Sequence, residues 1–502
     1  MKQTESGLTP QLAEMAAEIR GHAKDFGLDF FEVIFELLDY DALNMVAAYG
    51  GFPTRYPHWK FGMMYEELEK KYSYGLAKIY ELVINNDPCY AYLMKCNNPV
   101  DQKMVMAHVY GHSDFFKCNY WFSKTNRKMM DEVANHAVRI RRYIERYGLT
   151  KVEDCLDCCL SLDNLIDYHS PFIVRKKPAA VREEERERER DDLQPARLRS
   201  ARPYMEHYIN PPGVIQAERE RIAQKLEAQA RFPEEPEKDI LFFLIENAPL
   251  EKWQRDILSI IREEAYYFAP QGMTKIMNEG WASYWHSTIM TQKACTAAEI
   301  IDYADHHSGT LGTQPGSLNP YKVGLELFRD IEERWNKGRF GPEWENCDDA
   351  AKKASWDLKL GLGRQKIFEV RKIHNDVTFI DEFLTPEFCR GHQLFTYNFN
   401  KQSSEYVIES REFQAIKERL LFSLSNFGQP CIYLEDANYK NRGEMYLVHR
   451  FDGLPLKMDP ARDTMANLFK IWQRPINLQT VVDKRKKLLT YNGQKHEEKI
   501  LK

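Results

Sequence analysis

The sequence predicts a mainly helical protein with a small α+β domain near its C-terminal end. Apolar residues recur at helical spacing in residues 9–27 and 126–148, and again in 239–290. Beyond about residue 375 the pattern changes to short runs rich in β-branched and aromatic residues. Of the 502 residues 43% are apolar, including 27 Tyr, 27 Phe and 9 Trp. A chain of this length and composition is expected to fold into two or three packed units.

The first half of the chain divides into two segments. Residues 8–173 are predicted to form a helical region. Residues 174–236 are charged, interrupted by proline and poor in aliphatic side chains, which is typical of a linker or an exposed excursion. Its run REEERERERDD is predicted to be a solvated helix or a tether, with a docking strip for a partner as the alternative.

The second half also divides into two. Residues 237–375 are predicted to be a helical region that packs on the first, and Pro270 and Gly272 predict a break between two of its helices. Residues 376–485 are predicted to form the α+β domain. Strands are expected in FTYNFN, SEYVIES, PCIYLED and EMYLVHRF, around the helical REFQAIKERLLFSLSNFG.

Composition and charge exclude several classes of protein. A net charge of -5 gives no bulk attraction to nucleic acid, and no basic stripe with interleaved aromatic residues is present. No apolar run approaches the roughly 20 residues of a membrane span. The first 27 residues contain no continuous apolar stretch of the kind that directs export. We therefore expect a cytoplasmic protein without membrane insertion or nucleic-acid binding.

The ten cysteines have irregular spacing, which favours a reducing compartment. In CLDCC, Cys155, Cys158 and Cys159 resemble half of a zinc knuckle, but no second CxxC pair completes it. Because the surrounding sequence is apolar, these cysteines are predicted to be core residues of a helix.

Two histidines in MVMAHVYGHSDFF have the spacing of a metal site. His108 and His112 lie one helical turn apart, so both imidazoles leave one face of a helix toward a single point. With Gly111, HVYGH resembles the HExGH of several zinc metallopeptidases, with Val109 in place of the glutamate. That glutamate is the general base in those enzymes, so a hydrolytic site here needs a base from elsewhere. The alternative is a pair of structural histidines.

The segment NEGWASYWH supplies a third ligand. NEGWASY resembles the NEGFAxY helix of gluzincin aminopeptidases, and the likeness makes Glu279 the third metal ligand. His286 follows seven residues later on nearly the same helix face, as a fourth ligand or a hydrogen-bonding partner of the site. The predicted cofactor is a divalent metal, with zinc first and manganese or iron as alternatives. The predicted site is zincin-like and lies between helices.

The preceding segment REEAYYF offers catalytic candidates. Glu264 and Tyr267 are three residues apart and share a helix face, so Glu264 is the candidate general base and Tyr267 the candidate hydrogen-bond donor to an oxyanion. The alternative is that such carboxylates form buried ion pairs with arginines. His136, His306 and His307 are further candidates for the site.

The turn-prone segment RYPHWKFG offers a substrate-binding pair. Arg55 is a candidate for gripping a carboxylate or phosphate, with His58 beside it. The alternative is a packed turn stabilised by a cation–aromatic contact.

Six separated blocks of the sequence occur in the order found in one bacterial family. From about residue 10 to 480 the chain resembles the SpoVR family, the stage V sporulation protein R-like proteins. The blocks that carry the resemblance are GGFPTRYPHWKFGMMYEELEKKYSYGLAKIYELVINNDPCYAYLMKCN, MVMAHVYGHSDFFKCN, NHAVRIRRYIERYG, CLSLDNLID, REEAYYFAPQGMTKIMNEGWASYWH and SLNPYKVGLELFRDIEERW.

The resemblance implies a biological setting rather than a reaction. It implies a role in sporulation and the cell envelope, through spore cortex formation, or in stress physiology. It also implies a cytoplasmic location. The partners that it implies are a PrkA-type serine kinase and a von Willebrand-like companion protein. The valine of HVYGH belongs to the family pattern. The charged Arg/Glu run and the extra cysteines of CLDCC depart from that pattern.

Two functions follow as competing hypotheses. In the first, His108, His112 and Glu279 bind a metal that serves a hydrolase-like site for an amide or peptide bond. In the second, the chain is a non-catalytic regulator or scaffold that acts through protein partners, and its histidines and glutamates only hold helices together.

Overall fold

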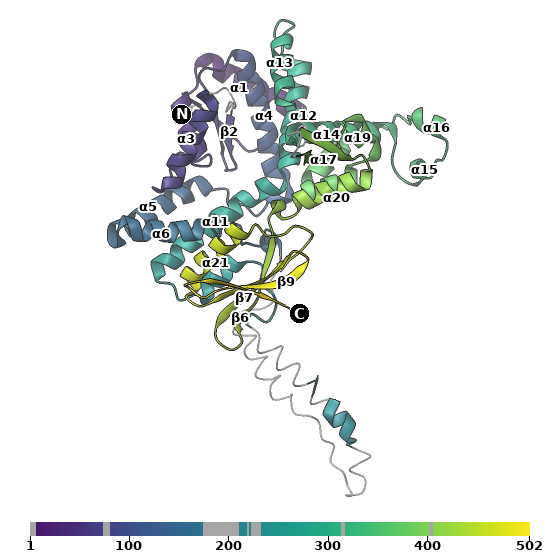
Figure 1. Cartoon of the computed structure of the whole chain (residues 1–502). Helices are drawn as coiled ribbons and strands as arrows, with labels where there is room; N and C mark the ends of the chain where they lie inside the picture. The colour runs from purple at the N-terminus through teal and green to yellow at the C-terminus, as the bar shows by residue number, and fades with distance from the viewer. Residues whose placement is uncertain are drawn as a thin grey trace. The chain divides into compact units, whose positions relative to one another are not determined.

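The computed structural model of the chain describes residues 7–73, 81–173, 210–217, 220–221, 232–312, 317–400 and 405–501. It divides into two compact units (Figure 1). Unit 1 is Met1–Glu153 with Tyr266–Gln429, and unit 2 is Asp154–Ala265 with Pro430–Lys502. Most of the predicted linker, including its REEERERERDD run, lies outside the described residues. The four-segment organisation stays a prediction.

Unit 1 is mainly helical, as predicted. Its described helices are α1 (Pro10–Asp25), α2 (Tyr40–Ala48), α3 (Trp59–Ser73), α4 (Pro99–Cys118), α5 (Met129–Tyr147), α12 (Lys275–Ile289), α13 (Ile300–Thr310), α14 (Pro320–Lys337), α15 (Pro342–Glu345), α16 (Ala350–Ala354), α17 (Gly363–Ile373), α18 (Asp376–Phe383), α19 (Pro386–Gly391) and α20 (Phe413–Leu424). Short turns are η1 (Tyr120–Phe122), η5 (Ser425–Gly428) and the π-helical η4 (Met290–Ala294) that continues α12. Two further helices, α6 (Leu149–Leu160) and α11 (Lys252–Met273), cross the division between the units.

Unit 1 also contains a small sheet that the sequence patterns did not predict. Its strands are β1 (Val33–Leu38), β2 (Glu81–Ile84) and β3 (Cys89–Met94), in the order β1-β3-β2, with β3 parallel to β1 and antiparallel to β2. Nearly every residue of β3 is buried, so the strand lacks the apolar–polar alternation that marks a half-exposed strand. A separate hairpin pairs β4 (Thr396–Asn400) with β5 (Glu405–Ser410).

Unit 2 contains the five-stranded sheet, which confirms a small α+β part toward the C-terminal end. Its elements are α10 (Ile240–Asn247), η2 (Ser170–Phe172), β6 (Cys431–Tyr439), β7 (Glu444–Arg450), α21 (Met458–Trp472), β8 (Ile476–Val482), β9 (Arg485–Tyr491) and β10 (His496–Ile500). The strand order is β10-β9-β8-β7-β6, and α21 connects the parallel pair β7 and β8. Cys158 and Cys159 are buried in α6, as predicted for core cysteines, whereas Cys155 on the same helix is only half-buried.

The predicted helix break at Pro270 and Gly272 is wrong in position. α11 continues through Pro270 to Met273, and the chain breaks at Thr274, directly before α12. A proline removes one backbone donor, and the loss is tolerated near a helix end where few hydrogen bonds remain to be made. The Thr274 hydroxyl also donates to the Pro270 carbonyl oxygen at 2.7 Å, which satisfies an acceptor at the helix end.

α12 is the central helix of unit 1 and packs against α4 and α14. Trp281 and Trp285 are fully buried on it, within a hydrophobic cluster of the unit. No helix among the described residues combines the length and the apolar character that crossing a membrane requires.

A buried carboxylate holds the start of α12. Asp376 accepts hydrogen bonds from the backbone N–H groups of Ile276 at 2.8 Å and Met277 at 2.9 Å. Burial raises the pKa of Asp376 to about 7, although the two backbone donors act in the opposite direction.

We expect the stability of unit 1 to fall as the pH rises through this pKa. An unfolded aspartate has a pKa of about 3.9, so between about pH 4 and pH 7 the folded state holds the extra proton. The stabilisation is complete below pH 4 and is lost as the pH passes 7. Urea unfolding at pH 5 and pH 8 should show a smaller pH dependence for Asp376→Asn than for the wild type. Equal pH dependence of the two proteins would contradict the assignment.

Candidate metal centre

The helix that holds the histidine pair, α4, begins at residues that favour a helix start. The Asn98 side chain accepts a hydrogen bond from the Asp101 N–H at 2.8 Å, and Pro99 occupies the first turn. His108 and His112 follow on one face of this helix, and both are buried.

A close approach of two helices brings the histidines to Glu279. A Cβ atom at Gly111 would lie 2.7 Å from the Cα of Ala282 on α12, closer than any real contact, so only glycine allows the two backbones to meet here. The glycine of HVYGH thus has a packing role that its likeness to the peptidase motif did not reveal.

Three ligand-type residues converge between α4 and α12. The Nε2 atom of His108 lies 3.5 Å from Oε2 of Glu279, and Nε2 of His112 lies 3.4 Å from the same oxygen. The ligand atoms of the three residues all lie within 4.8 Å of one another. The structure therefore brings together the two histidines and the glutamate that the two motifs predicted.

The outer nitrogen of His112 is held by the neighbouring residue of the motif. Its Nδ1 lies 2.9 Å from Oδ1 of Asn278. Since a carbonyl oxygen only accepts, Nδ1 carries the proton and donates, which leaves the lone pair of Nε2 directed toward Glu279.

The outer nitrogen of His108 faces a second histidine. Its Nδ1 lies 2.8 Å from Nδ1 of His286, and Nε2 of His286 lies 3.0 Å from Nδ1 of His307 on α13. When His108 donates from Nδ1, His286 accepts there and donates from Nε2 to His307. Both ring nitrogens of His286 are then in use, an arrangement that fits the partner role; the choice between fourth ligand and partner stays a prediction.

The electrostatics of the cluster favour an ionised Glu279 and a neutral His286. Burial acts to raise the pKa of Glu279, but His112 and His108 outweigh it and hold the pKa well below its usual range. Burial, together with His108 and His307, lowers the pKa of His286 well below its ordinary value. Deprotonated glutamate and neutral imidazole are the forms that bind metals.

The donor set and its spacing fit a divalent metal. Metals bound to imidazole and carboxylate have bonds of about 2.0–2.2 Å, so two ligand atoms of one ion lie about 3.0–3.6 Å apart. The two nitrogen–oxygen distances, 3.4 and 3.5 Å, have this separation. Two histidines and one carboxylate also leave a coordination position open for water or substrate.

The predicted catalytic pair is divided between the two units, with Tyr267 in unit 1 and Glu264 in unit 2. The Tyr267 hydroxyl donates to the backbone oxygen of Asn85 at 3.1 Å, so its proton is engaged there. Glu264 is buried in α11 on the unit 2 side of the division. Their roles as oxyanion donor and general base stay predictions.

The predicted substrate-binding pair makes the contacts of its structural alternative. The Arg55 guanidinium lies 5.0 Å from the ring centre of Phe61 and 5.3 Å from that of Tyr56. His58 accepts a hydrogen bond from the backbone N–H of Lys60 at 3.2 Å. A substrate role for Arg55 and His58 stays a prediction.

Sequence reasoning missed Asn278 and Tyr321. Asn278 directly precedes Glu279 in the NEG motif, and this position was the available signal. The Tyr321 ring on α14 lies 6.1 Å from that of His108 and nearly parallel to it. No sequence pattern indicates this contact, because it depends on how α14 packs.

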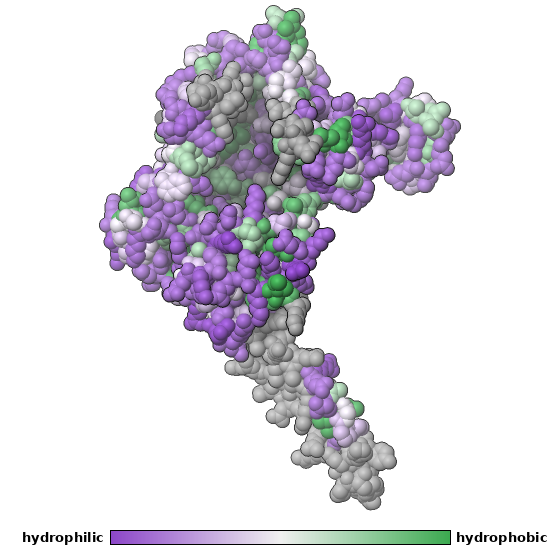
Figure 2. Space-filling model, in the orientation of Figure 1, coloured by the Kyte–Doolittle hydropathy of each residue, from purple (hydrophilic) through white to green (hydrophobic). Residues whose placement is uncertain are grey.

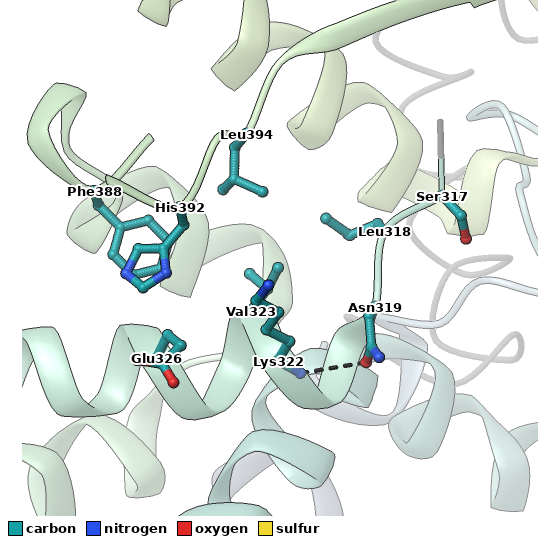
Figure 3. Close-up of a pocket in the computed structure, with 9 residues that line it drawn as sticks. All are labelled: Ser317, Leu318, Asn319, Lys322, Val323, Glu326, Phe388, His392 and Leu394. Carbon is teal, nitrogen blue, oxygen red and sulfur yellow. Dashed lines mark hydrogen bonds between the residues drawn. The ribbon is translucent and has the colours of Figure 1, made fainter. Parts of the chain in front are cut away.

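A pocket on α14 is separate from the cluster (Figure 3). Its empty volume is about 320 Å³, open mouth included, and its walls include Lys322, Glu326 and His392. The His392 ring packs against Phe388, with ring centres 4.3 Å apart. None of the three ligand-type residues lines this pocket.

Comparison with known proteins gives the family. The model of the family described as SpoVR like protein matches residues 8–429. The chain belongs to the SpoVR family. In this SpoVR chain the match includes both motifs of the cluster and ends at the last residue of unit 1, before β6. The uncharacterized protein YcgB of Escherichia coli (strain K12) is 30% identical over 494 residues, which cover 92% of this chain and 90% of that protein. No solved structure matches.

Proposed function

We propose that this SpoVR protein binds one zinc ion through His108, His112 and Glu279 and uses it to hydrolyse an amide or peptide bond. The observation that supports the proposal most is that Nε2 of both histidines lies within 3.5 Å of the same carboxylate oxygen of Glu279. Manganese and iron are the alternative metals. By family resemblance, the setting is the cytoplasm of a bacterium, in spore cortex formation, the cell envelope or stress physiology, with a PrkA-type kinase and a von Willebrand-like protein as partners.

Different residues of the chain have different roles in such a site. When bound, the metal supplies a Lewis acid that polarises a carbonyl and acidifies water. Asn278 and His286 hold the two histidine ligands in the required tautomers. Val109 is fully buried and has no proton-accepting group, so the base is another residue, for which Glu264 is our candidate.

A regulator or scaffold without catalysis is the second candidate. The observation that favours it is the continuous hydrogen-bonded series from His108 through His286 to His307, which links α4, α12 and α13 without any metal. In that case the histidines stabilise the packing of the helices.

Metal content separates the two candidates. We expect about one zinc per chain in untagged wild-type protein, and almost none in Glu279→Gln, which keeps the side-chain shape but loses the charge. His22→Asn is the control, since it removes a histidine of α1 that is paired with Glu18 and lies outside the cluster. Elemental analysis after dialysis against zinc, manganese and iron, with circular dichroism to verify folding, makes the measurement. Equal metal in wild type and Glu279→Gln, or no metal in either, would overturn the proposal.

Asn278→Ala is expected to weaken zinc binding by about 10- to 100-fold, because the ring of His112 loses the acceptor that fixes its tautomer. Asn278→Asp keeps an oxygen at that place and is expected to retain most of the affinity. Titration of the apoprotein with zinc against a coloured chelator gives both values. If the alanine and aspartate variants bind zinc equally, Asn278 does not position His112.

A further inference from the structure

One face of α4 continues from the metal cluster into an aromatic pocket. His108, His112 and Phe116 are spaced four residues apart and so lie along the same face of the helix. The Phe116 ring is nearly parallel to the His112 ring, with centres 6.0 Å apart. The same Phe116 lines a pocket, so a single ring separates a proposed metal ligand from that space.

The pocket is formed by segments that are distant in the sequence. It is bounded by the end of β2 and the residue after it, by the end of α4 and the turn that follows, and by the last turns of α11. Its empty volume, open mouth included, is about 330 Å³, and its lining residues are Gly50, Phe52, Val83, Ile84, Asn85, Phe116, Phe122, Tyr267, Phe268 and Gln271. Figure 2 shows a recess in unit 1 over β2 and α4, with hydrophobic residues on its walls.

The chemistry of the lining selects an uncharged apolar group. Five aromatic rings and two aliphatic side chains line the pocket, and no charged residue does. The Tyr267 hydroxyl is engaged with the Asn85 backbone oxygen, so Tyr267 contributes its apolar ring. Of the two polar amide side chains in the lining, Asn85 is buried and hydrogen-bonded to Thr125 and Arg127, whereas Gln271 is exposed and lies at the mouth. Burial of a charged group here would be costly.

We propose that this aromatic pocket receives an apolar side chain of the substrate next to the amide bond that is cleaved. The inference rests on the proposed function and deepens it by naming the substrate class: amides or peptides with an aliphatic residue beside the scissile bond. Phe116 is the residue that relates the two sites, because its ring stacks on His112 and also lines the pocket. Such a pocket contributes affinity through the area of apolar surface that it removes from water.

Two hydroxamates that differ only in the side chain test the inference. Glycine hydroxamate and leucine hydroxamate carry the same metal-binding group, and only the second has an isobutyl group for the pocket. On zinc-loaded wild-type protein, calorimetric titration is expected to show leucine hydroxamate binding at least about tenfold more tightly. Equal affinities of the two compounds, with zinc bound, would overturn the inference and leave the proposed function intact. Absence of bound zinc would overturn both.

Substitutions of Gln271, at the mouth of the pocket, test whether the isobutyl group of leucine hydroxamate binds in this pocket. Gln271→Trp places a large ring over the opening and is expected to remove the preference for leucine hydroxamate while zinc content and glycine hydroxamate affinity remain unchanged. Gln271→Ala keeps the mouth open and is expected to retain the preference. A preference that persists unchanged in Gln271→Trp would show that the isobutyl group binds elsewhere, and would overturn the assignment of this pocket.

Discussion

Gly280→Ala is expected to destabilise unit 1 by about 3 kcal/mol or more. Overpacking usually costs about 1–3 kcal/mol, and the cost here is at the upper end because the contacting atoms belong to the backbone, which cannot change rotamer. A Cβ atom at Gly280 would lie 2.4 Å from both Cα and the carbonyl carbon of Gly324, and 2.8 Å from the backbone nitrogen of Leu325. α12 and α14 therefore have to move apart. Because Glu279 precedes this glycine, the same movement is expected to weaken zinc binding.

Gly21→Ala is the matched control for this variant. Gly21 lies inside α1, and a Cβ atom there would have no neighbour within 4 Å. Alanine is a better helix former than glycine, so this change is expected to stabilise the protein by up to about 1 kcal/mol. Urea unfolding followed by tryptophan fluorescence reports on unit 1 through Trp281 and Trp285. If Gly280→Ala loses less than about 1 kcal/mol, the close contact between the helices is not rigid.

The parts of the fold that could be predicted are the helices and strands in which apolar residues recur at regular spacing. The helical class and the strands around FTYNFN, SEYVIES, PCIYLED and EMYLVHRF follow from patterns of apolar residues. β3 escaped prediction because both of its faces are buried, which removes alternation. The break after α11 was misplaced because the cost of Pro270 depends on how many hydrogen bonds follow it.

The candidate site was predictable where its geometry is local. His108 and His112 share a helix turn, and the likeness of two motifs placed Glu279 with them. The partners that fix the histidine tautomers come from α12 and α13, and the aromatic pocket draws on β2, α4 and α11, so these depend on tertiary packing. No spacing rule within one segment reveals such contacts.

The buried ion pair of Asp114 and Arg371 gives the other large expected effect. Both side chains are almost fully buried, with Arg371 Nε 3.3 Å from Asp114 Oδ2. The aspartate also accepts hydrogen bonds at 2.7 Å from the Asp29 backbone N–H and from the Trp281 indole. Burial raises the pKa of Asp114 to about 6, against the opposing effect of Arg371. Asp114→Asn keeps the shape but leaves a buried guanidinium without its counter-charge, so we expect a loss of about 3–5 kcal/mol.

A double-mutant cycle isolates the interaction energy between the charges of Asp114 and Arg371. Arg371→Met is also expected to destabilise the protein, because it removes the positive charge that lowers the pKa of the buried Asp114 and leaves this carboxyl group without its counter-charge. The double variant contains neither charge, so its loss at pH 8 is expected to be smaller than the sum of the single losses by about 2 kcal/mol or more. Additive losses, within about 0.5 kcal/mol, would show that the two charges do not depend on each other. Asp114 would then act only through its hydrogen bonds to Trp281 and Asp29, and the packing of α4 against α17 would not depend on the pairing of the two charges.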